Sequence, residues 1–229
     1  MAKHIGIVAA SSEGAALCYQ TICQEAVPLM GKHNHPELSM HTFPLAEHVK
    51  HIVTGNSEKL GKLMAESAQK LIDIGAEIII CPDNTNHIAF EEATKRTGAT
   101  WLHIAEEVCK CAKEAGVLKL GITGTKYLME SDVYPSACNH LNISTEIPKE
   151  PDMERLNDII FDELVSGVFL DTSRFEIVGI LEKLKSQGCD AVVMGCTEIP
   201  LIIRNGDSPL PTFDSTRILA RAALREALA

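Results

Sequence analysis

The sequence lacks the long hydrophobic stretch that a membrane-spanning helix needs. No segment approaches the roughly 20 consecutive apolar residues required to cross a bilayer. Residues 1–8 lead directly into a strand-like run, without a basic segment or a cleavage site. We therefore expect a cytoplasmic protein with no secretory signal and no membrane association.

The sequence also has fewer basic than acidic residues. The chain has 21 Lys and Arg residues against 31 Asp and Glu, which gives a formal net charge of -10 at pH 7. An acidic protein is repelled by phosphate backbones and by anionic lipid surfaces. We therefore expect no nucleic-acid partner, and the substrate is expected to be a small molecule.

The usual signatures of cofactors and metals are missing. The sequence has no dinucleotide fingerprint, and residues 121–126 lack the glycine spacing of a P-loop. A Ser-His-Asp ordering is not found either. Cys109 and Cys111 are two residues apart on a predicted helix, so they point in different directions and make a poor metal pair. We expect neither a cofactor nor a bound metal.

The eight cysteines do not predict a disulfide framework. The chain of 229 residues is long, its pattern is strongly helical, and it has no apparent leader. These properties favour reduced thiols, most of them acting as small buried hydrophobic side chains.

What the sequence does contain is a repeated alternation of strand-like and helix-like segments. Hydrophobic residues make up 45% of the chain, which is enough for a substantial core. Short apolar runs are typical of buried parallel strands, and longer segments with helical spacing follow them. This alternation predicts parallel sheets covered by helices, an α/β fold.

An internal repeat organises this pattern. Residues 75–85 resemble residues 188–198 at an offset of 113 positions, and residues 4–10 resemble residues 119–125 at an offset of 115. In the first pair a glycine that ends a helix is followed by a buried strand and a polar turn. The alignment places Asp83 opposite Cys196. Both follow a strand, at the end where parallel α/β folds bind ligands.

The polar turns of the repeat resemble those of a known family. Residues 84–87 (Asn-Thr-Asn-His) and residues 195–198 (Gly-Cys-Thr-Glu) are similar to the two signature motifs of the aspartate/glutamate racemase family, and the similarity runs through nearly the whole chain. The resemblance implies cofactor-independent proton transfer at an amino-acid α-carbon, and a homodimer. It also implies two pseudosymmetric α/β halves, which we expect to be flavodoxin-like, with the active site in the cleft between them. We expect residues 1–98 plus 212–229 to form one half and residues 99–211 the other.

The chain departs from the family pattern at the first motif. Asp83 stands where the family has a cysteine, and Cys81 comes two positions earlier, about 7 Å away along a strand. The basic residues that clamp a side-chain carboxylate in aspartate racemases have no clear match. His48 and Val165 stand in the corresponding regions.

The resemblance assigns Cys196 and Asp83 to opposite faces of one substrate. A helix N-terminus would favour the Cys196 thiolate. Asp83 is open to two interpretations, an acid/base that replaces the first cysteine or a helix N-cap. Aspartate is a weaker base than thiolate by about 4.6 pKa units, on the order of 6 kcal/mol, although burial would recover part of this difference.

Further side chains are candidates for binding the substrate. We expect them to donate hydrogen bonds to its carboxylate, together with backbone amides at the starts of the helices after Asp83 and Cys196. These candidates are Asn84, Thr85, Thr197, Ser11 and Thr125.

Three functions remain open on this evidence. The first is an amino-acid racemase or epimerase acting on aspartate, glutamate or a related amino acid. The second is a decarboxylase or isomerase of small dicarboxylic acids, which would need only the one thiol of Cys196. The third is a carboxylate-binding protein without catalysis, in which Asp83 only caps a helix.

Overall fold

The structure is a computed structural model that describes residues 2–204 and 206–229. The chain divides into two compact units, which are described separately. Unit 1 comprises residues 1–104 and 216–229, and unit 2 comprises residues 105–215. Within the described residues, no helix combines the length and the apolarity needed to span a membrane.

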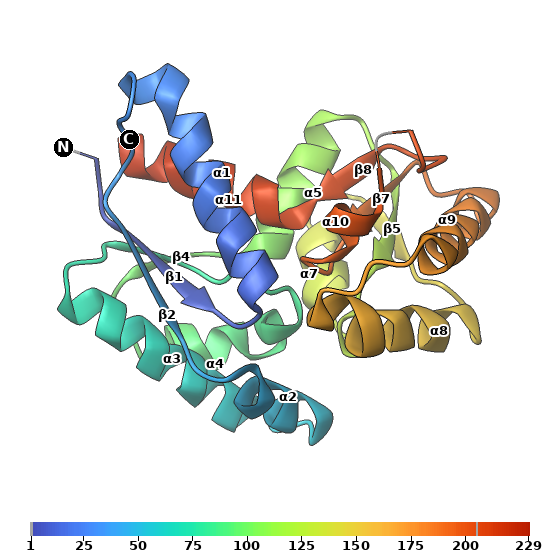
Figure 1. Cartoon of the computed structure of the whole chain (residues 1–229), viewed down its shortest axis with the longest axis horizontal. Coiled ribbons are helices and arrows are strands. Elements are labelled where there is room, and N and C mark those ends of the chain that lie inside the picture. The colour runs from blue at the N-terminus through green and yellow to red at the C-terminus, as the bar shows by residue number, and fades with distance from the viewer. Residues whose placement is uncertain (1, 205) are drawn as a thin grey trace. The chain divides into compact units, whose positions relative to one another are not determined.

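Unit 1 is built on a four-stranded parallel sheet with the strand order β2-β1-β3-β4 (Figure 1). Its strands are β1 (Ile5–Ala9), β2 (Leu38–Thr42), β3 (Ile78–Ile80) and β4 (Thr100–Leu102). Its helical segments are α1 (Ser12–Met30), α2 (Leu45–Val53), α3 (Ser57–Asp73), the 3-10 helix η1 (Thr85–Ala89), α4 (Phe90–Thr94) and nearly all of α11 (Ser215–Leu228).

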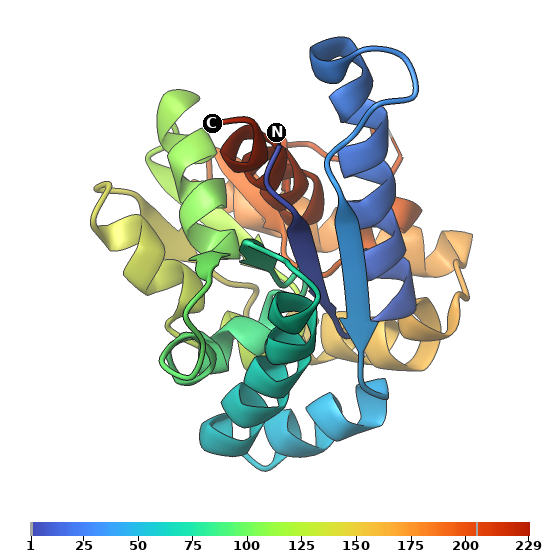
Figure 2. The same cartoon turned by 90° about the vertical axis from the view of Figure 1, so that its left-hand side faces the viewer.

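The two faces of this sheet carry separate cores because side chains alternate along each strand. Ile78 and Ile80 pack with residues of α1 and α11, whereas Ile79 and Cys81 pack with residues of α3 and α4. Figure 2 shows β1 and β2 running side by side with helices on both sides. Helices on both faces explain why β3 is a continuous apolar run.

The two ends of the chain meet in unit 1. The amide of Lys3 donates a hydrogen bond to the carbonyl oxygen of Ala227 at 2.9 Å. The ammonium group of Lys3 also lies 2.6 Å from the carboxylate of Glu226. Helix α11 is therefore attached to the start of β1, as Figure 1 shows from the positions of the termini.

Unit 2 repeats the architecture with the strand order β6-β5-β7-β8. Its strands are β5 (Lys119–Thr123), β6 (Ser144–Glu146), β7 (Ala191–Met194) and β8 (Thr212–Asp214). Its helical segments are α5 (Ile104–Glu114), α6 (Lys126–Met129), α7 (Val133–Asn139), α8 (Asp152–Asp158), the π-helix η2 (Ile159–Glu163), the 3-10 helix η3 (Leu164–Ser166), α9 (Asp171–Ser186) and α10 (Ile199–Ile202).

The register of the strands reproduces both offsets of the sequence repeat. Ile5 pairs with Ile78 in the first sheet, and Leu120 pairs with Ala191 in the second. Leu120 lies 115 positions after Ile5, and Ala191 lies 113 positions after Ile78. These are the two offsets of the sequence alignment. The predicted α/β fold with two similar halves is thus confirmed.

The borders of the units follow from strand pairing. Thr100–Leu102 pairs with β3, so these residues complete the first sheet rather than begin the second half. Thr212–Asp214 pairs with β7 and completes the second sheet. The structural division therefore lies at residues 104/105 and 215/216, compared with 98/99 and 211/212 in the sequence-based division.

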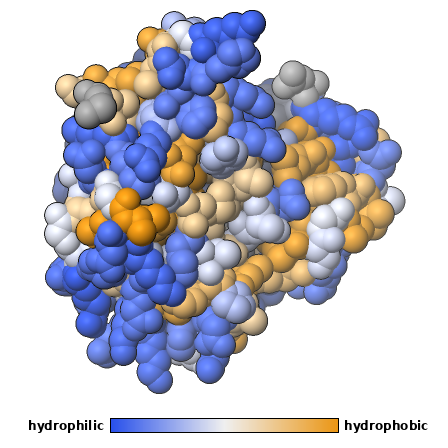
Figure 3. Space-filling model, turned by 60° about the vertical axis from the view of Figure 1, so that its left-hand side comes forward, coloured by the Kyte–Doolittle hydropathy of each residue, from blue (hydrophilic) through white to orange (hydrophobic). Residues whose placement is uncertain are grey.

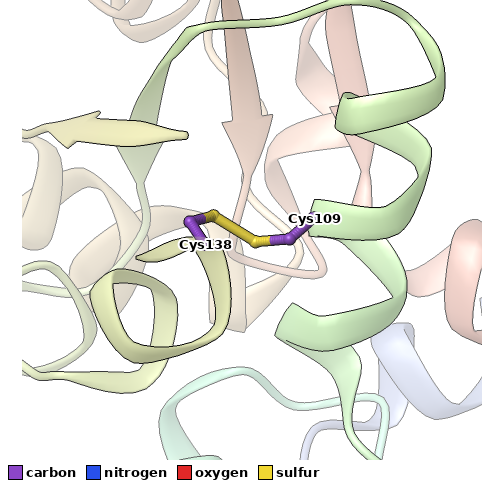
Figure 4. Close-up of a disulfide and its surroundings, with 2 residues drawn as sticks. All are labelled: Cys109 and Cys138. Carbon is purple, nitrogen blue, oxygen red and sulfur yellow. A yellow bond between two sulfur atoms is a disulfide. The ribbon is translucent and has the colours of Figure 1, made fainter. Parts of the chain in front are cut away.

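One pair of cysteines differs from the expectation of reduced thiols. Cys109 of α5 and Cys138 of α7 form a disulfide within unit 2 (Figure 4), with a Cα–Cα distance of 5.4 Å. The two residues are 29 positions apart in the sequence, and the disulfide joins α5 to α7. Nothing in the spacing of the cysteines indicated this contact. Cys111, two positions after Cys109, is not part of the pair.

Candidate active site

Asp83 follows β3 at the carboxyl end of the first sheet. The strand ends at Ile80, and Cys81 is fully buried against the α3 side of the sheet. Asp83 itself is half-buried. Ser11 follows β1, the strand next to β3, so Ser11 and Asp83 lie at the same edge of the sheet.

Asp83 has the geometry of a helix cap. Its Oδ1 accepts a hydrogen bond from the backbone amide of Asn86 at 3.0 Å. The amide of His87 donates to the carbonyl oxygen of Asn84 at 3.1 Å. Both amides are therefore engaged within the turn, whereas we expected amides here to point toward a substrate carboxylate. A carboxylate has two oxygens, and the cap uses Oδ1.

A buried polar network supports this turn. The side chain of Asn86 accepts from Nδ1 of His48 at 3.2 Å and contacts Sγ of Cys81 at 3.9 Å. Nε2 of His87 donates to the carbonyl oxygen of Cys81 at 3.0 Å. Among the described residues, Nε2 of His48 and Nδ1 of His87 are buried without a hydrogen-bond partner. Burial lowers the pKa of both histidines, so both are neutral in the folded protein.

Only part of this network was predictable from the sequence. Asn86 and His87 lie inside the first motif, so their proximity to Asp83 was expected. His48 is 38 residues from Asn86 and comes from α2, a helix that the sequence pattern did not indicate. No local signal links it to the turn.

The surroundings of Cys81 disfavour its thiolate form. Burial, with a smaller contribution from the charge of Asp83, raises the pKa of its thiol to about 12. Cys81 is therefore a neutral thiol at physiological pH, and its side chain belongs to the core cluster of α3 and α4.

The remaining candidates of unit 1 have defined positions. Ser11 is the N-cap of α1, and its hydroxyl oxygen accepts from the amide of Gly14 at 3.3 Å. Asn84 and Thr85 are buried directly after Asp83. The structure thus brings Asp83, Asn84 and Thr85 together in one turn, with Ser11 at the end of the neighbouring strand.

In unit 2, two glycines set the backbone that carries Cys196. The amide of Gly195 donates to the carbonyl oxygen of Thr123 at 2.8 Å. A Cβ atom at Gly195 would lie 2.4 Å from that oxygen, and one at Gly124 would lie 3.0 Å from the carbonyl oxygen of Gly195. The ends of β5 and β7 therefore approach closely only because both residues are glycines. Thr125 follows Gly124 and caps α6, where its hydroxyl oxygen accepts from the amide of Leu128 at 3.2 Å.

The thiol of Cys196 lies beside a buried carboxylate. Its Sγ donates to Oε2 of Glu198 at 3.0 Å, and the hydroxyl of Thr197 donates to the same oxygen at 2.6 Å. All three residues are at most 8% exposed. The helix that follows, α10, has only four residues. The turn therefore does not place Cys196 at the start of a long helix that would stabilise a thiolate, and the group that its thiol contacts is an acid.

Glu198 is a contact of Cys196 that the sequence interpretation did not single out. It was recognised only as the last residue of the second motif. The direction of its side chain, back toward Cys196, depends on the conformation of the turn and could not be derived from spacing. Among the residues that the structure describes, no group of three or more His, Cys, Asp or Glu side chains is arranged to hold a metal ion.

The comparisons with known proteins identify a family. The model of a family described as "Asp/Glu/Hydantoin racemase" matches residues 5–223. The chain is 24% identical over 211 residues to the broad specificity amino-acid racemase RacX of Bacillus subtilis, covering 90% of this chain and 88% of that protein.

Two solved structures resemble the whole chain. A candidate Asp/Glu racemase from Yersinia pestis is 30% identical, with a TM-score of 0.89, and the match covers 99% of this chain and 100% of the other. An aspartate racemase homologue from Pyrococcus horikoshii is 28% identical, with a TM-score of 0.84, and the match covers both chains completely.

Proposed function

The chain belongs to the Asp/Glu/hydantoin racemase family, and on this premise we propose that it is a cofactor-independent amino-acid racemase or epimerase. The observation that carries the proposal is the equivalence of Asp83 and Cys196. Each follows the strand that pairs with the first strand of its own sheet, β3 with β1 and β7 with β5. A repeated fold that presents an acid/base side chain at both equivalent positions suits a reaction with two proton-transfer groups.

The proposed reaction exchanges protons at the α-carbon. One group removes the α-proton, the C–H bond breaks, and its electron pair is delocalised into the substrate carboxylate. The other group then delivers a proton to the opposite face of the α-carbon. Asp83 starts as the carboxylate and Cys196 as the thiol for one enantiomer, and the opposite protonation states serve the other. Asn84, Thr85, Thr197, Ser11 and Thr125 remain our candidates for binding the substrate.

The test is proton NMR in deuterated water with a panel of L- and D-amino acids. We expect the wild-type protein to exchange the α-proton of both enantiomers and to interconvert them. The Cys196→Ala variant should lose racemisation by about 10²- to 10⁴-fold or more, the usual contribution of an acid/base group. Exchange without inversion should persist only for the enantiomer whose α-proton faces Asp83.

Asp83→Asn separates the two interpretations of Asp83. Asparagine is as good an N-cap as aspartate, so the hydrogen bond from Asn86 can be retained while the acid/base group is lost. We expect this variant to lose racemisation but to keep exchange of the enantiomer that faces Cys196. Full racemisation by Asp83→Asn would show that Asp83 is only a cap.

The proposed substrate is aspartate, glutamate or a related amino acid. The position of His48 bears on this choice, because it is a buried neutral histidine rather than a basic clamp for a second carboxylate. Neutral amino acids therefore belong in the NMR panel together with the acidic ones.

A second candidate function is favoured by one specific observation. Because Oδ1 of Asp83 is engaged as a cap, Cys196 could act as the single proton-transfer thiol. This would suit a decarboxylase or isomerase of a small dicarboxylic acid. Consumption of a malonate or maleate derivative, without α-proton exchange in any amino acid, would support this function instead.

We also propose that the protein forms a homodimer. Apolar residues are partly collected into patches on the surface face drawn in Figure 3. In unit 2 four large apolar side chains are more than 40% exposed within a short stretch, namely Val168, Phe169, Leu170 and Phe175. Light scattering coupled to size exclusion will measure the mass in solution. A mass of 24.9 kDa at all concentrations would contradict the proposal.

A further inference from the structure

A buried carboxylate in direct contact with the candidate acid/base thiol is the feature of unit 2 that the proposed reaction does not yet use. Oε2 of Glu198 accepts hydrogen bonds from both Cys196 and Thr197, at 3.0 and 2.6 Å. Its other oxygen, Oε1, is buried and has no hydrogen-bond partner among the described residues. Glu198 is 2% exposed. Burying a carboxylate in this way is costly, so its position requires an explanation beyond packing.

Apolar side chains also pack around the thiol. Cys196 belongs to a core cluster formed by side chains of α8, η2, η3, α9, β7 and α10. Among the described members of this cluster, the only other titratable side chain is Cys189, whose pKa is raised by burial. Glu198 is a buried carboxyl group that the structure places in hydrogen-bond contact with Cys196.

We propose that Glu198 is a positioning residue that holds Cys196 in its thiol form, and this rests on the proposed racemase function. Two physical effects act in the same direction. A hydrogen bond from the neutral thiol to the carboxylate exists only while the proton is on sulfur, and a thiolate would face a like charge at about the same distance. Both effects favour the protonated side chain.

The consequence is a defined resting state for the reaction. Cys196 carries the proton and serves as the acid, while Asp83 is ionised and serves as the base. This agrees with the lower basicity of a carboxylate compared with a thiolate. The first turnover then begins with the enantiomer whose α-proton faces Asp83. When Cys196 has given its proton to the α-carbon, the thiolate beside Glu198 is the less stable form. It recovers its proton from the opposite enantiomer, whose α-carbon then receives the proton held by Asp83, or from solvent, to which Asp83 releases its proton.

The test measures the protonation of Cys196 directly, without any substrate. Wild-type protein and the isosteric variant Glu198→Gln are treated with iodoacetamide between pH 6 and 10, and alkylation is followed by mass spectrometry of the peptide that contains Cys196. Thiolates react and thiols do not. We expect the midpoint of the reactivity curve to fall by at least one pH unit in Glu198→Gln, which makes alkylation at pH 7 about tenfold faster. An unchanged midpoint, or one that moves upward, would overturn the proposal.

Two further variants keep the test informative. Glu198→Asp retains the charge at a greater distance and should fall between the wild type and Glu198→Gln. Thr197→Val removes the second donor to Oε2 but keeps the thiol contact, so its midpoint should stay near that of the wild type. Circular dichroism checks that each variant is folded.

The alkylation result is independent of the racemase proposal. A lowered midpoint in Glu198→Gln with no α-proton exchange in the NMR panel would reject the racemase function and leave the contact of Glu198 with Cys196 intact. When exchange is observed, the pH profile of the Cys196-facing direction should move to lower pH in Glu198→Gln. A loss of activity that is the same at every pH would indicate a merely structural role and contradict the proposal.

Discussion

Cys81 and Asp83 lie two residues apart after β3 but in different surroundings. Cys81 joins the apolar cluster of α3 and α4, while the Asp83 carboxylate lies in a polar turn. Side chains two positions apart lie on the same face of a strand. Cys81 and Asp83 differ in environment because β3 ends at Ile80, before either of them. The reactivity of the two positions follows from this difference.

We expect Cys81 to resist alkylation in the folded protein. With a pKa of about 12, its thiolate fraction at pH 8 is about 10⁻⁴, and its side chain is fully buried. Mass spectrometry after iodoacetamide treatment should find Cys81 unmodified, while the partly exposed Cys23 and Cys111 are modified. Cys81→Ala should retain racemisation. Loss of racemisation in a folded Cys81→Ala variant would argue that Cys81, and not Asp83, is the second proton-transfer group.

For single residues, the sequence predicted which element a side chain follows better than it predicted which other side chains it contacts. The N-cap interpretation of Asp83 follows from its residue type and from the strand before it, and the structure contains that hydrogen bond. The sequence also showed that Cys81 stands two positions before the site of the missing cysteine. The contact of Glu198 with Cys196 and that of His48 with Asn86 were not, because they depend on side-chain conformation and on a long-range approach of α2.

Among the elements, α3 and α4 pack unusually closely at Gly61. A Cβ atom at Gly61 would lie 2.4 Å from Cβ of Glu92 and 3.1 Å from the carbonyl oxygen of Ala89. The absence of a side chain therefore allows α4 to lie against α3, directly after the turn that carries Asp83. Glycine is otherwise unfavourable inside a helix.

Gly61→Ala should therefore destabilise the protein although alanine is the better helix former. We expect a loss of about 1–3 kcal/mol from the forced separation of α3 and α4. The matched control is Gly179→Ala in α9, where a Cβ atom would have no neighbour within 4 Å. That substitution should stabilise by about 0.4–1 kcal/mol. Chemical denaturation measures both, and equal effects of the two substitutions would refute the packing argument.

The elements themselves were largely predictable. The buried strand predicted within residues 75–85 exists as β3, and a polar turn follows it as predicted. The apolar residues of the segment 152–165 have the spacing of one amphipathic helix, but the structure has three successive segments there, α8, η2 and η3. Hydrophobic spacing alone does not distinguish an α-helix from a π-helical turn within it. The short helices α6, α7 and α10 were too brief to leave a periodic signal.

For the whole molecule, buried histidines connect stability to pH. Burial lowers the pKa of His48 and His87 below the reference value of about 6.5. The unfolded chain therefore binds protons more readily than the folded chain, so stability is complete above pH 6.5 and decreases as the pH falls. Below pH 6.5, each of these histidines contributes a slope of up to about 1.4 kcal/mol per pH unit until the pH reaches its folded-state pKa.

We expect Tm to fall between pH 7.5 and pH 5, and His48→Asn should reduce the steepness of that fall. Differential scanning calorimetry over this range provides the measurement. Cys196→Ala is the control, since it leaves every histidine in place and should keep the wild-type slope. A Tm that is independent of pH in this window would mean that the two histidines are protonated in the folded protein.

The duplicated architecture was the most predictable property of the whole molecule. The offsets of 113 and 115 positions in the sequence correspond to the register of β3 with β1 and of β7 with β5. The disulfide between Cys109 and Cys138 was not foreseen, since it depends on the packing of two helices that are separate in the sequence.

The hydrogen bond between Lys3 and Ala227 makes the backbone nearly a closed ring. A short peptide linker between the two ends would complete the ring, and new ends could then be opened in an exposed turn, such as the one at Gly116. In such a circular permutant unit 1 would be a continuous segment and unit 2 would be divided. The order in which the two halves emerge during synthesis could thus be reversed without altering any side chain of either motif.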